Sequence, residues 1–160
     1  MTLRAAALAA LFALTGCTGF VIDPPEDFVV LEEPDGGPFA LRASSADGVV
    51  LGVRELPGAE NASLTFWARA VAGRLETARG YRRTGEEAVR AESGEEGRLL
   101  AFSRSEGGEE FTYWAAVFPA PPAAPLGAPR LYLVEAGGPK AAFEAARPAL
   151  KRSLRSLRID

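Results

Sequence analysis

The chain of 160 residues contains no histidine and only one cysteine. Histidine is the commonest general base in enzymes and the commonest protein ligand of transition metals, so its absence removes the simplest route to either chemistry. A single cysteine excludes an intramolecular disulfide. The sequence therefore predicts no catalytic residue, no metal site and no cofactor site, and we expect a protein that is not an enzyme.

A surplus of positive charge is also missing, since the formal net charge is -3. The arginines are spread along the chain and interleaved with glutamates. Nucleic-acid-binding domains concentrate basic residues in a patch or stripe, which this sequence does not do. We therefore expect no nucleic-acid partner, and the mixed charges indicate a solvated surface.

Long hydrophobic runs are scarce, and the longest one lies at the N-terminus. Arg4 is followed by an apolar run over residues 5–14. This run is about half of the roughly 20 residues that a membrane-spanning helix needs. A positive residue before a short apolar run is typical of a secretory signal, although a buried N-terminal helix is the alternative.

The apolar run ends in Leu14-Thr15-Gly16-Cys17. These four residues resemble the lipobox of bacterial lipoproteins: an aliphatic residue, a small residue, Gly or Ala, and then Cys. The resemblance implies that Cys17 receives a diacylglyceryl group and that residues 1–16 are removed as a signal peptide. A plain secretory signal with an incidental cysteine is the alternative. Thr18 in place of Asp resembles the outer-membrane sorting class, which favours the periplasmic face of that membrane over the inner membrane.

Residues 17–27 are predicted to hold the lipidated cysteine and a short tether, since Pro24-Pro25 cannot join a helix or a central strand. Fully extended, this tether would reach on the order of 35 Å, at about 3.3 Å per residue. Residues 28–160 then form one domain.

Strands are predicted on both sides of one helix. Alternating apolar residues and turn signals indicate strands at 28–33, 39–44 and 49–56, the last two joined as a hairpin by Asp47-Gly48. Apolar residues from Leu64 to Ala78 recur at three- and four-residue spacing, which predicts a helix with Asn61 as N-cap and Gly80 as its end. Asn61-Ala62-Ser63 also matches a glycosylation sequon.

Four further strands follow at 81–93, 98–104, 110–118 and 130–136. The last two are apolar on both faces, so they need cover on both faces. The proline-rich residues 119–129 between them indicate an extended loop. A second helical pattern runs from Phe143 to Leu157 and contains Pro148. The helix either kinks there or begins there, and the sequence favours the second.

The predicted fold is therefore α+β: an antiparallel sheet of about six to seven strands with helices on both faces, in the order β-β-β-α-β-β-β-β-α. The last strand and helix resemble those of the PsbP/Mog1-like α/β/α sandwich superfamily. The positions that carry this resemblance are Tyr132, Gly137, Phe143, Pro148, Ser156 and Leu157. It implies a non-catalytic protein, as in photosystem extrinsic subunits, small-GTPase binders and envelope lipoproteins, and it identifies no partner-binding residue here.

Weak candidates for chemistry have simpler explanations. Ser153 and Lys151 are close in sequence but lie on a helix of mixed charge. The acidic pairs are expected to be exposed charge in or beside turns: Glu86-Glu87, Glu95-Glu96 and Glu109-Glu110. The glycine pairs at 36–37, 107–108 and 137–138 are expected to be turns, because none has phosphate-loop spacing. Trp67 and Trp114 are expected in the core.

Two features suggest binding instead. The proline-rich loop around Leu126 resembles segments that dock in aromatic grooves, although a long hairpin connection is the simpler and favoured explanation. A cleft between the sheet and the first helix is a possible site for a small apolar ligand. The sequence thus predicts a non-enzymatic lipoprotein that presents a binding or support domain to an envelope partner. A lipoprotein that binds a small apolar ligand is the alternative.

Overall fold

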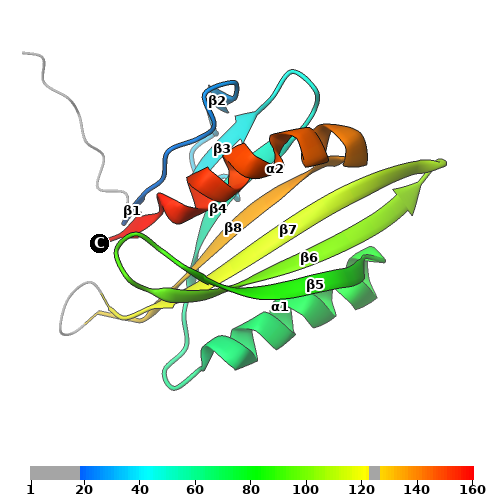
Figure 1. Cartoon of the computed structure of the whole chain (residues 1–160). Coiled ribbons are helices and arrows are strands. Elements are labelled where there is room, and N and C mark those ends of the chain that lie inside the picture. Colours follow the sequence, from blue (N-terminus) through cyan, green and yellow to red (C-terminus); the bar gives the residue numbers. More distant parts are fainter. Residues whose placement is uncertain (1–18, 123–126) are drawn as a thin grey trace, which may run out of the picture.

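The computed structural model describes residues 19–122 and 127–160. Two helices and nine strands lie within these ranges (Figure 1). Their order along the chain is β1 (Phe20–Val21), β2 (Val29–Leu31), β3 (Leu41–Ser44), β4 (Val50–Pro57), α1 (Leu64–Arg79), β5 (Arg82–Arg90), β6 (Glu96–Glu106), β7 (Glu109–Ala120), β8 (Arg130–Pro139), α2 (Lys140–Arg155) and β9 (Arg158–Ile159).

Seven of the strands form one sheet in the order β2-β3-β4-β8-β7-β6-β5. Every neighbouring pair in it is antiparallel. Short hairpins join β3 to β4, β5 to β6, and β6 to β7, whereas β4 reaches β8 only through the long excursion over α1 and three strands. The predicted antiparallel sheet of six to seven strands with a helix on each face is confirmed.

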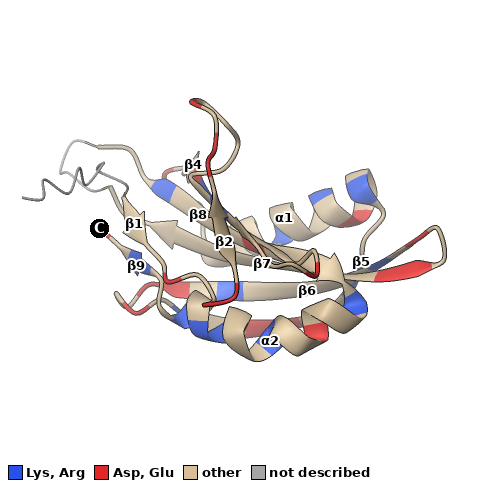
Figure 2. Ribbon diagram, turned by 90° about the horizontal axis from the view of Figure 1, so that it is seen from above, with Lys and Arg blue, Asp and Glu red and all other residues tan. Residues whose placement is uncertain are grey.

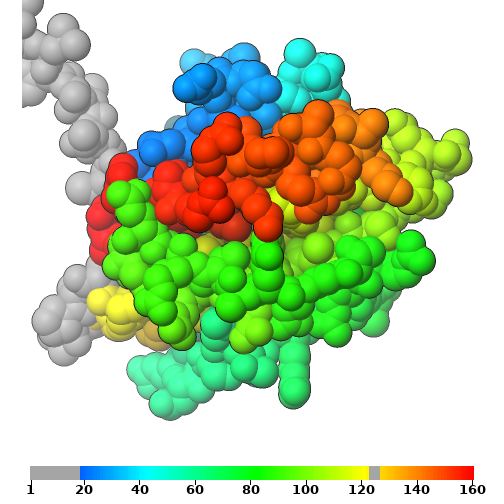
Figure 3. Space-filling model, in the orientation of Figure 1, coloured from blue at the N-terminus to red at the C-terminus, as the bar shows by residue number. Residues whose placement is uncertain are grey.

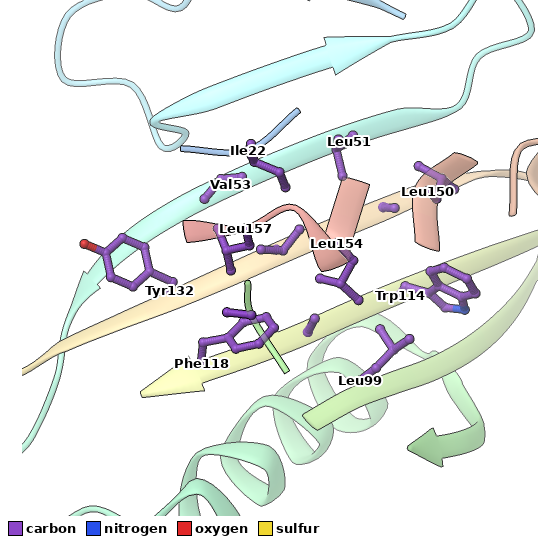
Figure 4. Packing of buried hydrophobic residues seen from close by; sticks show 14 of the residues in the cluster. Ile22, Leu51, Val53, Leu99, Trp114, Phe118, Tyr132, Leu150, Leu154 and Leu157 are labelled. Carbon is purple, nitrogen blue, oxygen red and sulfur yellow. The ribbon is translucent and has the colours of Figure 1, made fainter. Parts of the chain in front are cut away.

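The central strands β7 and β8 are buried on both faces, as their two apolar faces predict. One face contributes Trp114, Ala116 and Phe118 to a core under α2, shown in Figure 4. The other face contributes Ala115, Val117 and residues of β8 to a smaller core under α1. Two separate cores on one sheet are what alternating side chains produce when both faces are covered.

The two helices do not lie opposite each other. Helix α1 packs on β5, β6 and β7, whereas α2 packs mainly on β8 and β7. On the face that carries α2, the helix therefore covers β8 and β7 and leaves β5 and β6 to one side of it (Figure 1). Side chains of α2 and β5 line two depressions between these elements.

The N-cap of α1 differs from the prediction. Ser63 caps the helix, since its Oγ accepts a hydrogen bond of 3.1 Å from the Phe66 N–H. Asn61 instead has a φ of 62°, a left-handed turn conformation that asparagine tolerates better than most residues. Asparagine and serine are comparable caps, so sequence preference alone does not separate two candidates two residues apart. Gly80, with a φ of 66°, ends the helix as predicted.

Helix α2 continues through Pro148, so the prediction that it begins there is wrong. Proline lacks the N–H that would bond the carbonyl of Glu144 one turn earlier. Pro148 is exposed, which places the interrupted turn toward water. The buried Phe143, Leu150 and Leu154 lie on both sides of it in the chain and hold the two halves of the helix on the sheet.

The segment expected as a tether is folded from Gly19 onward. Phe20 and Val21 pair with Ile159 and Arg158 to form a two-stranded sheet. Phe20 and Ile22 are buried in the core under α2. Buried Phe20 and Ile22 alternate with exposed Val21, as in a strand. This pattern is only three residues long, and the prolines that follow it indicate an irregular segment, so the sequence does not predict a strand here.

The proline-rich connection is shorter than predicted because β7 continues through Pro119 to Ala120. Pro119 pairs with Leu131 of β8, whereas the pairing of β7 with β6 ends at Val117. A proline is tolerated there because β7 has become an edge strand on that side. The expected docking residue Leu126 lies outside the described residues.

Candidate functional site

The predicted lipidation site, Cys17 with its lipobox Leu14, Thr15 and Gly16, lies outside the described residues, so it stays a prediction. In the described part of the chain, no helix is long and apolar enough to cross a membrane. Nor do its residues include a cluster of three or more potential metal ligands.

The acidic pairs do not converge on one site. Glu86 and Glu87 lie within β5 rather than beside a turn, and their side chains form ion pairs on opposite faces of the sheet. Glu86 is 3.3 Å from Arg98, and Glu87 is 2.8 Å from Lys151 of α2. Glu96 pairs with Arg90, and Glu110 with Lys140. Each of these carboxylates is exposed and neutralised by a neighbour, which is typical of surface ion pairs.

Ser153 and Lys151 do not form a catalytic pair. Ser153 is buried, with 3% of its surface exposed, on the side of α2 that faces the core. Lys151 extends to β5, where its Nζ meets Glu87. A nucleophile needs a base within hydrogen-bonding distance, and these two side chains leave the helix in different directions.

The strongest candidate site is the channel between α2 and β5, here called the α2 groove (Figure 3). It consists of two adjoining depressions of 360 and 230 Å³ that share Ala101, Trp114 and Arg147. Its floor is formed by β6 and β7, including Leu99, Ala101 and Trp114. One wall is β5, with Arg82, Thr84 and Glu87, and the other is α2.

Arg147 is the central side chain of the α2 wall. Its guanidinium lies 4.8 Å from the centre of the Trp114 ring and 5.6 Å from that of Phe143. It also donates two hydrogen bonds to Glu144, of 2.7 and 2.5 Å. These bonds hold the pKa of the Glu144 carboxyl below its ordinary value. A general acid needs a raised pKa, whereas the pKa of Glu144 is lowered, so Glu144 is not suited to that role.

Charges line the groove but largely cancel. Lys140 pairs with Glu110 at 3.5 Å, and Lys151 with Glu87 at 2.8 Å, so both pairs bridge α2 to the sheet. Arg82 is hydrogen-bonded to Ser103 of the floor instead of to an acid. Figure 2 shows basic and acidic residues mixed along α2. The groove thus offers a partly apolar floor with Trp114, and a rim of hydrogen-bonding groups of both signs.

The opposite face carries a compact polar cluster of Arg54, Glu135 and Tyr113. Glu135 accepts hydrogen bonds from Arg54 Nε, at 2.5 Å, and from the Tyr113 hydroxyl. The guanidinium of Arg54 stacks 4.3 Å from the centre of the Phe39 ring, which itself covers Gly52. Glu135 thus binds both of its neighbours in this cluster, which joins β4, β7 and β8.

The predicted cleft for an apolar ligand between the sheet and the first helix stays a prediction. Three depressions of the described residues lie beside α2 instead, the third of 610 Å³ between α2 and residues 23–27. Charged and polar side chains line each of them. Trp114, expected in the core, is 4% exposed and lies in the core directly below the groove floor. Trp67, also expected in the core, is a half-buried residue of α1 that packs against the smaller core.

Sequence reasoning did not find the α2 groove. Its residues come from β5, β6, β7 and α2, and they are separated by up to about seventy positions along the chain. The available signal was Trp114 in a strand apolar on both faces, with basic residues at helical spacing in the last helix. Neither reveals that α2 is displaced toward β8.

Comparison with solved structures finds the same architecture in proteins of different origin. LpqN of Mycobacterium tuberculosis, described as involved in cell envelope biogenesis, is 17% identical, with a TM-score of 0.69 over 88% of this chain and 82% of LpqN. Cyanobacterial PsbP of Synechocystis is 13% identical, with a TM-score of 0.61 over 89% of this chain and 87% of the other.

The Ran-binding protein Mog1p of Saccharomyces cerevisiae is 12% identical, with a TM-score of 0.55 over 88% of this chain and 90% of its own. No protein-family model matches the sequence, and no curated protein matches it. At these identities the likeness establishes the architecture alone. The chain therefore has the PsbP/Mog1-like α/β/α fold, as the sequence of its last strand and helix had indicated.

Proposed function

We propose that the protein is a lipid-anchored, non-enzymatic protein of the bacterial envelope that binds a polar segment of another envelope component in its α2 groove. The anchor is the diacylglyceryl group expected on Cys17, and Thr18 favours the periplasmic face of the outer membrane. The likeness to LpqN, which is described as acting in envelope biogenesis, agrees with this location.

The observation that carries the binding function is the composition of the groove. Half-buried Ala101 gives its floor an apolar surface, at which only 4% of Trp114 is exposed, and Arg82, Thr84 and Arg147 add hydrogen-bond donors around it. Interfaces that bind other proteins combine aromatic and arginine contacts with a polar rim in this way.

A photo-crosslinking amino acid at Thr84 tests the binding function in intact cells. Thr84 is exposed on the β5 wall of the groove. The matched control is Thr65, a second exposed threonine, which lies on α1 on the opposite face. We expect a discrete crosslinked product from position 84 that is absent from position 65. Equal products at both positions, or none at 84, would exclude the groove as the binding site.

Metabolic labelling with a fatty acid, followed by membrane flotation, tests the anchor separately. We expect the wild type to incorporate label and to float with membranes, and Cys17→Ser to do neither. A wild-type protein without label would overturn the anchor and leave the groove experiment unaffected.

A further inference from the structure

The described residues begin at Gly19, two positions after the cysteine proposed to carry the lipid, and Gly19 is already part of the folded domain. The Gly19 carbonyl accepts hydrogen bonds from the Tyr132 hydroxyl, at 2.9 Å, and from the Asp160 N–H, at 3.0 Å. Tyr132 lies in the central strand β8 and is fully buried. Gly19 is therefore bound to the middle of the main sheet rather than to a peripheral loop.

The residues after Gly19 are fixed just as firmly. Phe20 is 3% exposed and packs edge-on against the Tyr132 ring, with 5.8 Å between the ring centres. Ile22 is 5% exposed. The Asp23 N–H donates to Ser156 Oγ at 2.9 Å. Gly19 itself has no room for a side chain, because a Cβ there would lie 2.5 Å from the Tyr132 hydroxyl.

This docking removes most of the reach of the predicted tether. Successive Cα atoms are 3.80 Å apart, so the Cα atoms of residues 17 and 19 are at most about 7.6 Å apart. The extended tether predicted from the sequence would reach roughly 35 Å at ~3.3 Å per residue. A lipid on Cys17 therefore holds the part of the domain around Gly19 close to the headgroups.

The surface around Gly19, here called the anchor end, is suited to that position. Arg130 of β8 lies beside Gly19 and pairs in register with both Pro57 and Ala120. The backbone of Gly58 bonds to Pro129 at the same end. Small or cyclic residues are exposed there: Pro57, Ala59, Pro121 and Pro122. Arg130 is paired with Glu55 at 3.7 Å and also donates to the Asp160 carbonyl, so its guanidinium is already bound within the domain.

The opposite end of the domain is the β6–β7 hairpin. Strand β7 spans 12 residues from the hairpin to the anchor end, which is about 36 Å at ~3.3 Å per residue. Exposed glutamates gather at this hairpin, at positions 106, 109 and 110. Figure 1 shows β1 and the C-terminus at one end of the long strands and the hairpin at the other.

We propose that the anchor end rests against the lipid headgroups of the bilayer, so that the β6–β7 hairpin and the adjoining part of the α2 groove point away from the membrane. This orientation rests on the lipidation of Cys17 in the proposed function. It adds that the bilayer contacts one end of the fold and that the groove, with Glu110 and Lys140 on its rim, is presented to the envelope space.

Labelled cysteines in the full lipidated protein test this orientation. The chain has one cysteine, and lipidation consumes its thiol, so an introduced cysteine is the only one that a dye can modify. The two sites are Ala59→Cys at the anchor end and Glu109→Cys at the hairpin, both exposed. The protein is bound to phosphatidylethanolamine–phosphatidylglycerol vesicles with a headgroup-attached quencher, and vesicle binding is measured by flotation.

We expect the dye at position 59 to be quenched several-fold more strongly than the dye at position 109. A control variant carries a 20-residue Gly/Ser insertion after Thr18, whose root-mean-square length is about 25 Å. In this control the difference should largely disappear. Flotation with equal quenching at both sites, or stronger quenching at 109, overturns the orientation alone. Failure of the labelled protein to float overturns the anchor and the orientation together.

Discussion

At the scale of single residues, Trp114 has two roles, because it fills the core under α2 and also forms the groove floor. It packs edge-on against Phe143, with 4.9 Å between the ring centres. We expect Trp114→Ala to lower the free energy of unfolding by about 3–5 kcal/mol, as large-to-small changes in cores do. Phe66→Ala is the control, since Phe66 is 54% exposed, and it should cost well below half as much in chemical denaturation.

Tyr113 gives the fold a pH dependence in the alkaline range. Burial, reinforced by the neighbouring Glu135 carboxylate, raises the pKa of Tyr113 above its ordinary value of 10.0. The folded protein then keeps a proton that the unfolded chain loses. The tyrosine contribution to stability is therefore complete below pH 10 and is lost as the pH rises above it.

We expect the free energy of unfolding to fall between about pH 9.5 and 11.5, and to fall less steeply in Tyr113→Phe. The substitution should also cost about 1–3 kcal/mol at pH 7, because it removes the donor that binds Glu135. Denaturation curves at several pH values measure both effects. Parallel pH profiles of the two proteins would show that Tyr113 ionises normally in the folded state.

At the scale of elements, the short strand β1 differs most from the sequence prediction. It has two residues, and its partner β9 lies more than 130 positions later in the chain. Periodicity is a local signal, so it finds the long hairpin strands and misses a pairing of this kind. The prolines at 24 and 25 follow β1 and prevent its extension, but they do not make the segment an extended tether, since Pro25 is itself buried.

The adjacent residues Phe20 and Val21 provide a matched test of this element. Phe20→Ala should lower the free energy of unfolding by about 3 kcal/mol, because it empties a fully packed site beside Tyr132. Val21 is 43% exposed, and Val21→Ala should change stability by less than ~1 kcal/mol. Thermal denaturation of the two variants measures the difference. Equal effects would mean that β1 does not contribute to folding.

Pro148 tests the continuity of α2. The helix holds its shape although Pro148 removes one backbone hydrogen bond on its exposed side. We expect Pro148→Ala to restore that bond and to raise the free energy of unfolding by about 1 kcal/mol or more, since proline is the poorest residue in a helix interior. Chemical denaturation measures the gain. A loss of stability would indicate that α2 packs on the sheet only when it is bent at this residue.

At the scale of the whole molecule, the sequence was sufficient for the architecture but not for the surface. Strands apolar on both faces required a layer on each side of the sheet, and short hairpins required antiparallel pairing, and both expectations hold. The α2 groove depends on where α2 lies across the sheet. That position is set by the fit of Phe143, Leu150 and Leu154 between β7 and β8, which no local pattern expresses.

The docking of residues 19–22 onto the domain, only two positions after Cys17, predicts a characteristic response to proteolysis. Proteases cut exposed, unpaired backbone, whereas residues 20–22 are paired or buried. On the lipidation of Cys17 proposed above, we therefore expect a non-specific protease to release little intact domain from vesicles that carry the wild-type protein. The variant with 20 Gly/Ser residues inserted after Thr18 should release the intact domain rapidly, which gel analysis of the supernatant measures. Because both proteins share the same fold from Gly19 onward, their internal cleavage provides the control. Equal rates of release would mean that β1 detaches from β9 on the membrane, and that the domain is held there less closely than its hydrogen bonds to Gly19 require.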